Sequence, residues 1–228
     1  MTSYSQSGQD IFLNEHIFKG FKNGTFVDVG AYDGKEGNNT LFFEENFNWT
    51  GINIEPLPSV FEKLKINRPK CINMNVAIDK EDNQEKDFIE NQGYTAMLSG
   101  LKEHYDTRHL ERLDRENKEY NVKSQTIKVK TRRLHSILEE KKIDRIHYLS
   151  IDVEGAERAV LGTIDFSKVF IDVIGFENNF WDSSIKTMIP LLKIGYFPFA
   201  EKTDILLIHQ TSPFNVGLPK ESKLSFQV

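Results

Sequence analysis

The chain has 228 residues, of which 39% are hydrophobic, and no Pro-, Gly- or Ser-rich linker divides it, so we expect one domain over residues 1–228. Its net charge of −5 and pI near 5.7 argue against a general affinity for nucleic acid or anionic membranes, because neutralising phosphates takes clustered Lys and Arg. The single cysteine, Cys71, and the lack of a secretion signal or of roughly 18 consecutive apolar residues predict a cytoplasmic protein without membrane insertion.

Strands and helices alternate in the first third of the sequence. A polar cluster at residues 5–10 leads into a first helix, and a buried strand is predicted at residues 26–29. The next predicted elements are a helix at 41–47, a strand at 49–55, a helix around 60–64 and a strand at 72–78. Strand–helix–strand repeats predict a parallel sheet with right-handed crossovers.

A glycine-bearing turn follows the first strand. Gly30 and Gly34 are four residues apart and Asp28 precedes them, which gives D-x-G-x-x-x-G rather than the dinucleotide fingerprint G-x-G-x-x-G. This spacing suits S-adenosylmethionine, whose sulfonium and ammonium charges are compatible with carboxylates such as Asp28 and Asp33. Glu55 ends the second strand at the distance where an acid meets ribose hydroxyls. An NAD(P)-dependent oxidoreductase is the alternative, and the glycine spacing disfavours it.

The alternation stops between residues 79 and 133, where we expect an inserted helical lid. This segment combines a polar turn at 79–84, a charged helical run at 101–120 and a strand at 125–130. Five basic residues recur near helical spacing in it: His104, Arg108, His109, Arg112 and Arg115. They could form a positive face, but neighbouring acids favour a solvated helix.

The alternation returns after residue 133. A short helix around 134–138 precedes predicted strands at 146–152 and 169–177, and a helix at 185–194 precedes a closing hairpin at 196–200 and 205–209. A loosely held tail is expected from residue 215. Ligands of a parallel sheet bind outside the carboxyl ends of its strands, so the acids at those ends should face one crevice. They are Asp28, Glu55, Asp152 and Glu177.

Taken together, these motifs resemble the FkbM family of S-adenosylmethionine-dependent methyltransferases. The matching segments, in chain order, are residues 5–10, 26–34, 54–56, 75–77, 151–157 with 160–161, and 176–178. The resemblance implies a class I methyltransferase fold, an α/β Rossmann-like seven-stranded sheet that is mostly parallel, with an antiparallel last strand and helices on both faces. It also implies O-methylation, often of a sugar or natural-product hydroxyl. One departure is Tyr32-Asp33, where the family usually has an asparagine directly after the alanine.

The resemblance also implies where the cofactor binds. It places Asp28 and Gly30 around the methionine part, Glu55 on the ribose, residues 75–77 near the adenine and Asp152 beside the transferring methyl group. The predicted cofactor-binding residues are Gln9, Asp28, Gly30, Tyr32, Asp33, Gly34, Asn39, Thr40, Glu55, Pro56, Val76, Ala77 and Asp152.

Activation of the acceptor is the remaining chemical problem, because a sugar hydroxyl is too weak an acid to ionise near pH 7. Asp152, Glu177 and Asn178 offer oxygen ligands at the ends of adjacent strands, a set suited to Mg²⁺ or Mn²⁺. They resemble the strand-end ligands of divalent-metal-dependent O-methyltransferases on this fold. Alternatively, Glu177 and Asn178 are structural or bind the acceptor directly.

Glu154 is the preferred general base and, with Asp152, makes up the predicted catalytic pair. His209 is a second candidate, but an antiparallel closing strand should end at the opposite rim of the sheet. A catalytically silent scaffold in glycan assembly is a further hypothesis, and the intact acids at 152 and 154 weigh against it. The expected partner is a small-molecule or glycan acceptor with a free hydroxyl, and no nucleic acid.

Overall fold

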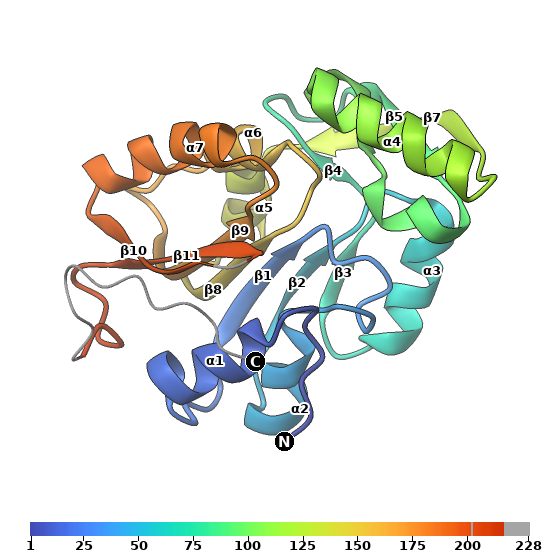
Figure 1. Ribbon diagram of the computed structural model, residues 1–228. Coiled ribbons are helices and arrows are strands. Elements are labelled where there is room, and N and C mark those ends of the chain that lie inside the picture. Colours follow the sequence, from blue (N-terminus) through green and yellow to red (C-terminus); the bar gives the residue numbers. More distant parts are fainter. Residues whose placement is uncertain (202, 217–228) are drawn as a thin grey trace.

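The computed structural model describes residues 1–201 and 203–216 of the chain (Figure 1). Most of the tail predicted from residue 215 therefore lies outside the described residues. Within the described part of the chain, no helix is long and apolar enough to cross a membrane.

A seven-stranded sheet forms the centre of the molecule, with the strand order β10-β11-β9-β8-β1-β2-β3. The strands are β1 (Thr25–Val29), β2 (Thr50–Ile54), β3 (Ile72–Met74), β8 (Arg145–Ile151), β9 (Phe170–Glu177), β10 (Tyr196–Glu201) and β11 (Asp204–His209). Every pair is parallel except those of β11, which runs antiparallel to both β9 and β10. The predicted class I methyltransferase fold is confirmed, including its antiparallel last strand.

Helices cover both faces of this sheet, which is why the central strands are apolar on both sides (Figure 1). On one face lie α1 (Gln9–Leu13), which continues as a π-helical turn at Asn14–Phe18, and α2 (Leu41–Phe47). On the other lie α5 (Leu134–Glu140), α6 (Glu157–Gly162) and α7 (Trp181–Lys193). Successive side chains of β1 serve both layers: Phe26 packs in the aromatic-rich core under α1 and α2, and Val27 in the aliphatic core under α5 to α7.

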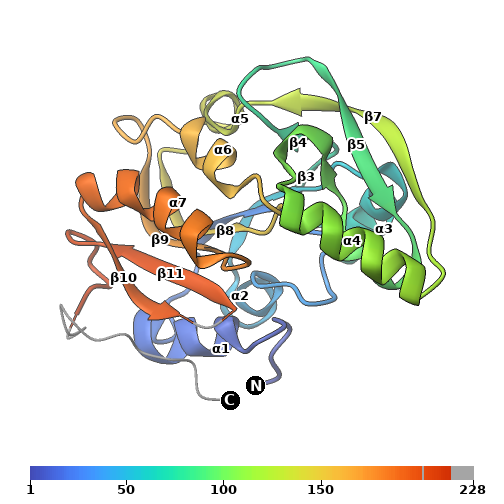
Figure 2. The same cartoon turned by 45° about the horizontal axis from the view of Figure 1, so that its top comes forward.

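The insertion contains strands as well as the predicted helix, and together with β4, which directly precedes it, they form a second sheet. Its four strands have the order β4-β7-β5-β6 and comprise β4 (Ala77–Ile78), β5 (Glu85–Asn91), β6 (Gly100–Leu101) and β7 (Ser124–Arg132). Helix α4 (Thr107–Glu119) crosses this sheet, and 3-10 turns lie at Gly93–Leu98 and Lys102–His104 (Figure 2). The strand predicted at 72–78 is thus two strands, because β3 ends at Met74 and β4 joins the other sheet.

A small apolar core joins the insertion to the main sheet. Leu57 and Val60, at the start of α3 (Pro58–Asn67), pack with Phe88, Leu101 and Val129 of the insertion. The insertion is therefore held beside the carboxyl ends of β1 and β2, where the sequence predicts the binding crevice (Figure 1).

Candidate active site

A cavity of about 520 Å³ lies outside the carboxyl ends of β1, β2 and β8. Seven of the predicted cofactor-binding residues line it: Gly30, Tyr32, Glu55, Pro56, Val76, Ala77 and Asp152. The insertion lines its other side with apolar residues that include Phe88, Met97 and Leu101. This size and mixture of apolar walls with a few polar groups are typical of a small-molecule site.

Gly30 allows β1 to end against its two neighbours. Its φ of +85° is a conformation that side chains disfavour, and a Cβ atom there would lie 1.7 Å from the carbonyl oxygen of Asp152. The Gly30 N–H donates to the carbonyl of Ile54 (3.0 Å), and the Asp152 N–H donates to that of Val29 (2.9 Å). The turn is therefore fixed between β2 and β8, with its backbone facing the cavity.

Glu55 is held in the cavity wall with only 5% of its surface exposed. Its Oε2 accepts from the Tyr32 N–H (3.1 Å) and its Oε1 from the Leu57 N–H (2.8 Å). Burial raises the pKa of Glu55 to about 7, and these two backbone hydrogen bonds oppose the rise. Each carboxylate oxygen accepts one bond in this arrangement and retains a lone pair for a ligand hydroxyl.

Asp28 is buried behind the cavity wall, which it does not line, and it bonds to the residues that follow the glycine turn. Its Oδ2 accepts from Asn38 Nδ2 (2.9 Å) and from the Thr40 hydroxyl (2.8 Å). Arg68, which is fully buried, donates to Asn38 Oδ1 (2.9 Å), Thr40 Oγ1 (3.1 Å) and the Gly34 carbonyl (3.2 Å). Burial raises the pKa of Asp28, while Arg68 lowers it. This hydrogen-bond network holds the glycine turn in place through the bond from Arg68 to the Gly34 carbonyl.

Six predicted cofactor-binding residues do not line the cavity: Gln9, Asp28, Asp33, Gly34, Asn39 and Thr40. Gln9 Nε2 reaches Thr203 Oγ1 (3.4 Å), Asp33 Oδ1 accepts from two backbone N–H groups within its own turn (both 2.9 Å), and Asn39 Nδ2 donates to Ser150 Oγ (3.2 Å). Contact between these residues and a cofactor stays a prediction. In the structure, the side chains of Gln9, Asp33 and Asn39 make hydrogen bonds to other parts of the protein. From the N-terminal segment, Gln6 lines the cavity instead.

Three carboxylates gather at the ends of β8 and β9. Ligand oxygens of Asp152, Glu154 and Glu177 all lie within 4.8 Å of one another, and all three residues line the cavity. Burial and then repulsion from Glu154 raise the pKa of Asp152 well above its usual range, although the side chain is exposed to the cavity and solvent there moderates the effect. Burial and then Asp152 raise the pKa of Glu177.

Asn178, the third metal ligand predicted from the sequence, does not line the cavity that Asp152 and Glu177 share. Its Oδ1 accepts a hydrogen bond from the Ser184 hydroxyl of α7 (2.7 Å), and its backbone N–H donates to the Thr203 carbonyl (2.7 Å). The structure thus engages the Asn178 amide with α7.

His109 reaches the cluster from the insertion. Its side chain is 2% exposed, and its Nε2 lies 2.6 Å from Glu154 Oε2. Glu154 is itself buried, with a φ of +52°. The interpretation of this helix as wholly solvated is wrong at His109. The sequence feature that could have indicated this burial is the spacing of His109 and Leu113. They are four residues apart, so they lie on the same face of α4, and both are buried.

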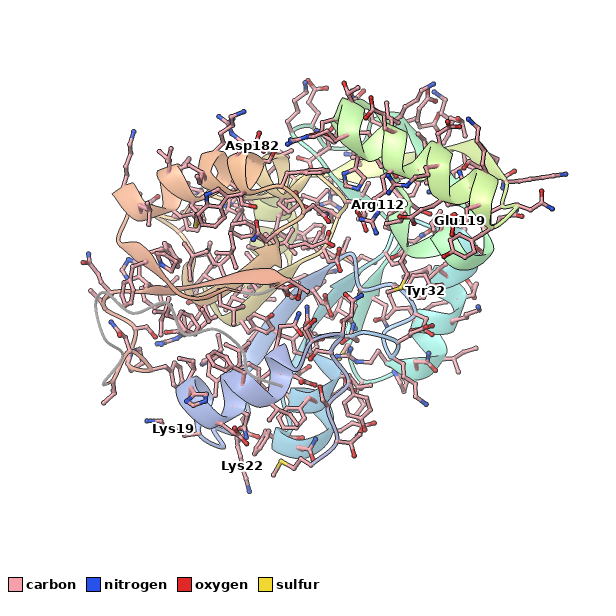
Figure 3. All side chains as sticks on the ribbon, viewed as in Figure 1. Lys19, Lys22, Tyr32, Arg112, Glu119 and Asp182 are labelled. Atoms are coloured by element: carbon pink, nitrogen blue, oxygen red, sulfur yellow. The ribbon has the colours of Figure 1, made fainter. Side chains whose placement is uncertain are left out.

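Arg112, also on α4, lines the cavity opposite Tyr32 (Figure 3). Its Nε donates to Glu116 Oε1 (2.8 Å). His209, the second base candidate, does not line this cavity, and its Nε2 lies 3.0 Å from the Ile194 carbonyl oxygen.

Residues 28–199 match the methyltransferase FkbM domain. The chain belongs to the FkbM methyltransferase family. It is therefore an S-adenosylmethionine-dependent methyltransferase, and the oxidoreductase alternative is set aside.

Solved structures similar to this FkbM domain include two methyltransferases. One is described as a putative rRNA-methylase from Clostridium thermocellum, with a TM-score of 0.43 and 8% identity over 91% of this chain and 97% of that chain. The other is a precorrin-6y C5,15-methyltransferase from Geobacter metallireducens GS-15, with a TM-score of 0.42 and 10% identity over 89% and 86% of the two chains. No curated protein matches the chain.

The cavity of the FkbM domain fits S-adenosylmethionine. Glu55 has lone pairs available for the ribose hydroxyls, and residues Pro56, Val76 and Ala77 line the wall beside it. Gly30 lines the cavity without a side chain, so it presents backbone to the ligand. The carboxyl groups at 152, 154 and 177 gather on one wall of the cavity, and a sulfonium cation beside them would favour their ionised forms.

Proposed function

We propose that this methyltransferase is an O-methyltransferase that acts on a hydroxyl of a sugar, a glycan or a glycosylated natural product. The observation that carries the proposal is the carboxylate cluster at the cofactor cavity, paired with a buried histidine. A hydroxyl acceptor must lose its proton during transfer, so its enzyme needs groups that take or stabilise a proton at the acceptor. Positioning of the acceptor contributes the other large share, on the order of 7 to 11 kcal/mol.

A methyl-transfer screen tests this proposal. The protein would be incubated with S-adenosylmethionine carrying a radioactive methyl group and with panels of sugars, glycans, amines and thiols. We expect product with hydroxyl acceptors, identified as a methyl ether by NMR. Transfer only to nitrogen or sulfur would contradict O-methylation. Tight cofactor binding without transfer to any panel member would support the silent-scaffold hypothesis.

A divalent cation is part of the proposal, with Asp152 and Glu177 as its ligands. Both are carboxylates that line the cavity, and burial raises the pKa of each. Repulsion from Glu154 adds to the rise at Asp152, and repulsion from Asp152 adds to it at Glu177. A hard cation would relieve that repulsion, and Mg²⁺ often binds through one or two carboxylates with water or substrate oxygens completing its shell. When bound, such an ion would stabilise the negative charge that develops on the acceptor oxygen.

Chelation gives the corresponding prediction. EDTA should lower turnover by about a hundredfold or more, and Mg²⁺ or Mn²⁺ should restore it, because a bound cation contributes several kcal/mol to charge stabilisation. Cofactor affinity, measured by calorimetry in the same chelator, is the control and should stay within about threefold. Full turnover in EDTA would remove the metal from the mechanism without affecting the methyltransferase assignment.

A further inference from the structure

A second cavity, of about 240 Å³, lies between the insertion and the helices α6 and α7. Glu177 lines both this cavity and the cofactor cavity, so the two meet at the carboxylate cluster. Figure 2 shows α4 beside α6 and α7. Arg108 of α4 donates to Asp182 at the start of α7 (2.8 Å) and covers the Phe180 ring at 3.9 Å, which ties the two sides together.

His109 contributes an unpartnered nitrogen atom to this second cavity. Its Nε2 lies 2.6 Å from Glu154 Oε2, and a carboxylate can only accept, so Nε2 is the donor. In a neutral imidazole the lone pair is then on Nδ1. Among the described residues, none provides a hydrogen bond to Nδ1. Gly155 lies beside that atom: a Cβ added to Gly155 would be 3.7 Å from Nδ1 and 3.2 Å from the His104 carbonyl oxygen. A glycine at 155 therefore leaves space in front of Nδ1.

The ring of His109 is held in one orientation. The N-cap Asp106 accepts from the His109 backbone N–H (2.9 Å), which fixes the start of α4. Tyr105 and Phe180 pack edge-on against the imidazole, with ring centroids 5.3 and 5.9 Å away. A carboxylate on one nitrogen and a lone pair on the other is the arrangement of a general base oriented by an acid.

We propose that the second cavity binds the acceptor and that His109 Nδ1 is the general base, with Glu154 as its positioning residue. The inference rests on the proposed O-methylation. In the step, the acceptor O–H bond breaks and its proton goes to Nδ1, while the oxygen bonds to the methyl carbon. The carbon–sulfur bond breaks, and its electron pair stays on sulfur as a neutral thioether. Imidazole is suited to proton transfer near neutral pH.

The other walls of the second cavity combine polar and aromatic groups. Asn179, whose Nδ2 donates to Glu177, and Ser183 provide hydrogen-bonding groups, and Phe180, which Arg108 covers on one side, provides an aromatic ring beside them. Sugars combine a polar edge with an apolar face and need both kinds of group. The proposal changes the role predicted for Glu154, which acts through His109 instead of taking the proton itself.

The state of the imidazole can be tested without an acceptor. Proton–nitrogen NMR on protein labelled with ¹⁵N-histidine should show His109 with its hydrogen on Nε2 and a lone pair on Nδ1 at pH 8. The Glu154→Ala variant should lose this preference, because the acceptor of the Nε2 hydrogen is gone. A hydrogen on Nδ1 in the unmodified protein would overturn the proposal even if O-methylation is established.

Turnover provides the second test, with a hydroxyl acceptor found in the screen. His109→Gln keeps a donor for Glu154 but offers no base, and His109→Ala leaves a gap that added imidazole can fill. Both should lower kcat by about 10² to 10⁴-fold, and imidazole should partly rescue the alanine variant. Cofactor affinity should be unchanged, because His109 does not line the cofactor cavity.

Arg115→Ala is the matched control, since Arg115 is an exposed residue of the same helix that lines neither cavity. It should retain full turnover. A His109→Gln variant that binds the cofactor normally and keeps kcat within about threefold would overturn the proposal. If the unmodified protein methylates no hydroxyl, the proposed function fails, and the NMR result is unaffected by that failure.

Discussion

Glu55 is a titratable residue in the wall of the cofactor cavity. Its carboxylate is buried, and burial raises its pKa to about 7, above the ordinary value of 4.5. A raised folded-state pKa means that this group's contribution to stability is complete below about pH 4.5 and is lost as the pH rises through about 7. Above that pH the folded protein holds an ionised carboxylate, stabilised by two backbone N–H groups.

Cofactor affinity should therefore depend on pH. Ribose hydroxyls donate more strongly to an ionised carboxylate, so the Kd for S-adenosylmethionine should fall by up to about tenfold between pH 6 and pH 8. Isothermal titration calorimetry across this range measures the effect. Glu55→Gln should bind more weakly and lose the pH dependence. An unmodified protein whose Kd does not change with pH would show that Glu55 does not titrate as described.

At the scale of elements, the end of β1 is defined by contacts on three sides. The turn after β1 bonds to β2 through Gly30, approaches β8 at Asp152 and is supported from behind by Arg68. Arg68 is fully buried, and its guanidinium also lies 5.1 Å from the centre of the Phe26 ring. A buried cation of this kind depends on all its partners, so the turn and the network form one unit.

Replacing Gly30 should break that unit. In Gly30→Ala the new methyl group would meet backbone at 1.7 Å and the residue would have to keep a φ of +85°, so we expect a loss of about 3 kcal/mol or more in the free energy of unfolding. Urea denaturation measures it.

Gly162→Ala is the matched control for this substitution. It lies at the end of α6, where an added Cβ meets nothing within 4 Å, and it should stabilise the protein by about 0.5 kcal/mol. Equal effects of the two substitutions would contradict the close approach of β1 to β8.

At the scale of the whole molecule, the cofactor cavity lies between two sheets. The seven-stranded sheet contributes Glu55, and the insertion contributes Met97, Leu98 and Leu101. Binding should therefore order both parts at once, although the residues involved are far apart in the sequence.

Hydrogen exchange gives a direct measure of this coupling. With S-adenosylmethionine bound, backbone amides at residues 93–101 should exchange more slowly, as should those at 30–37, because ligand binding suppresses local opening. Glu55→Gln at the same cofactor concentration is the control and should show weaker protection in both segments. Protection confined to 30–37 would mean that the insertion does not contact the cofactor.

The sequence by itself determined the main sheet and the position of the cofactor cavity. Apolar runs identify the buried strands, and parallel strands align their carboxyl ends at one edge of a sheet. The positions of Glu55 and Asp152 therefore follow from chain order, and Gly30 follows from the need for a turn without a side chain. The family motifs lie in these same segments.

Only the tertiary structure decided the rest of the site. β5 is largely polar and half-exposed, so its sequence carries no pattern of a buried strand. The pair of His109 with Glu154 joins residues 45 positions apart across an insertion, and the orientation of Asn178 toward Ser184 depends on the packing of α7. Strand ends are aligned by backbone pairing, which local sequence predicts, whereas side-chain contacts between elements depend on how those elements pack.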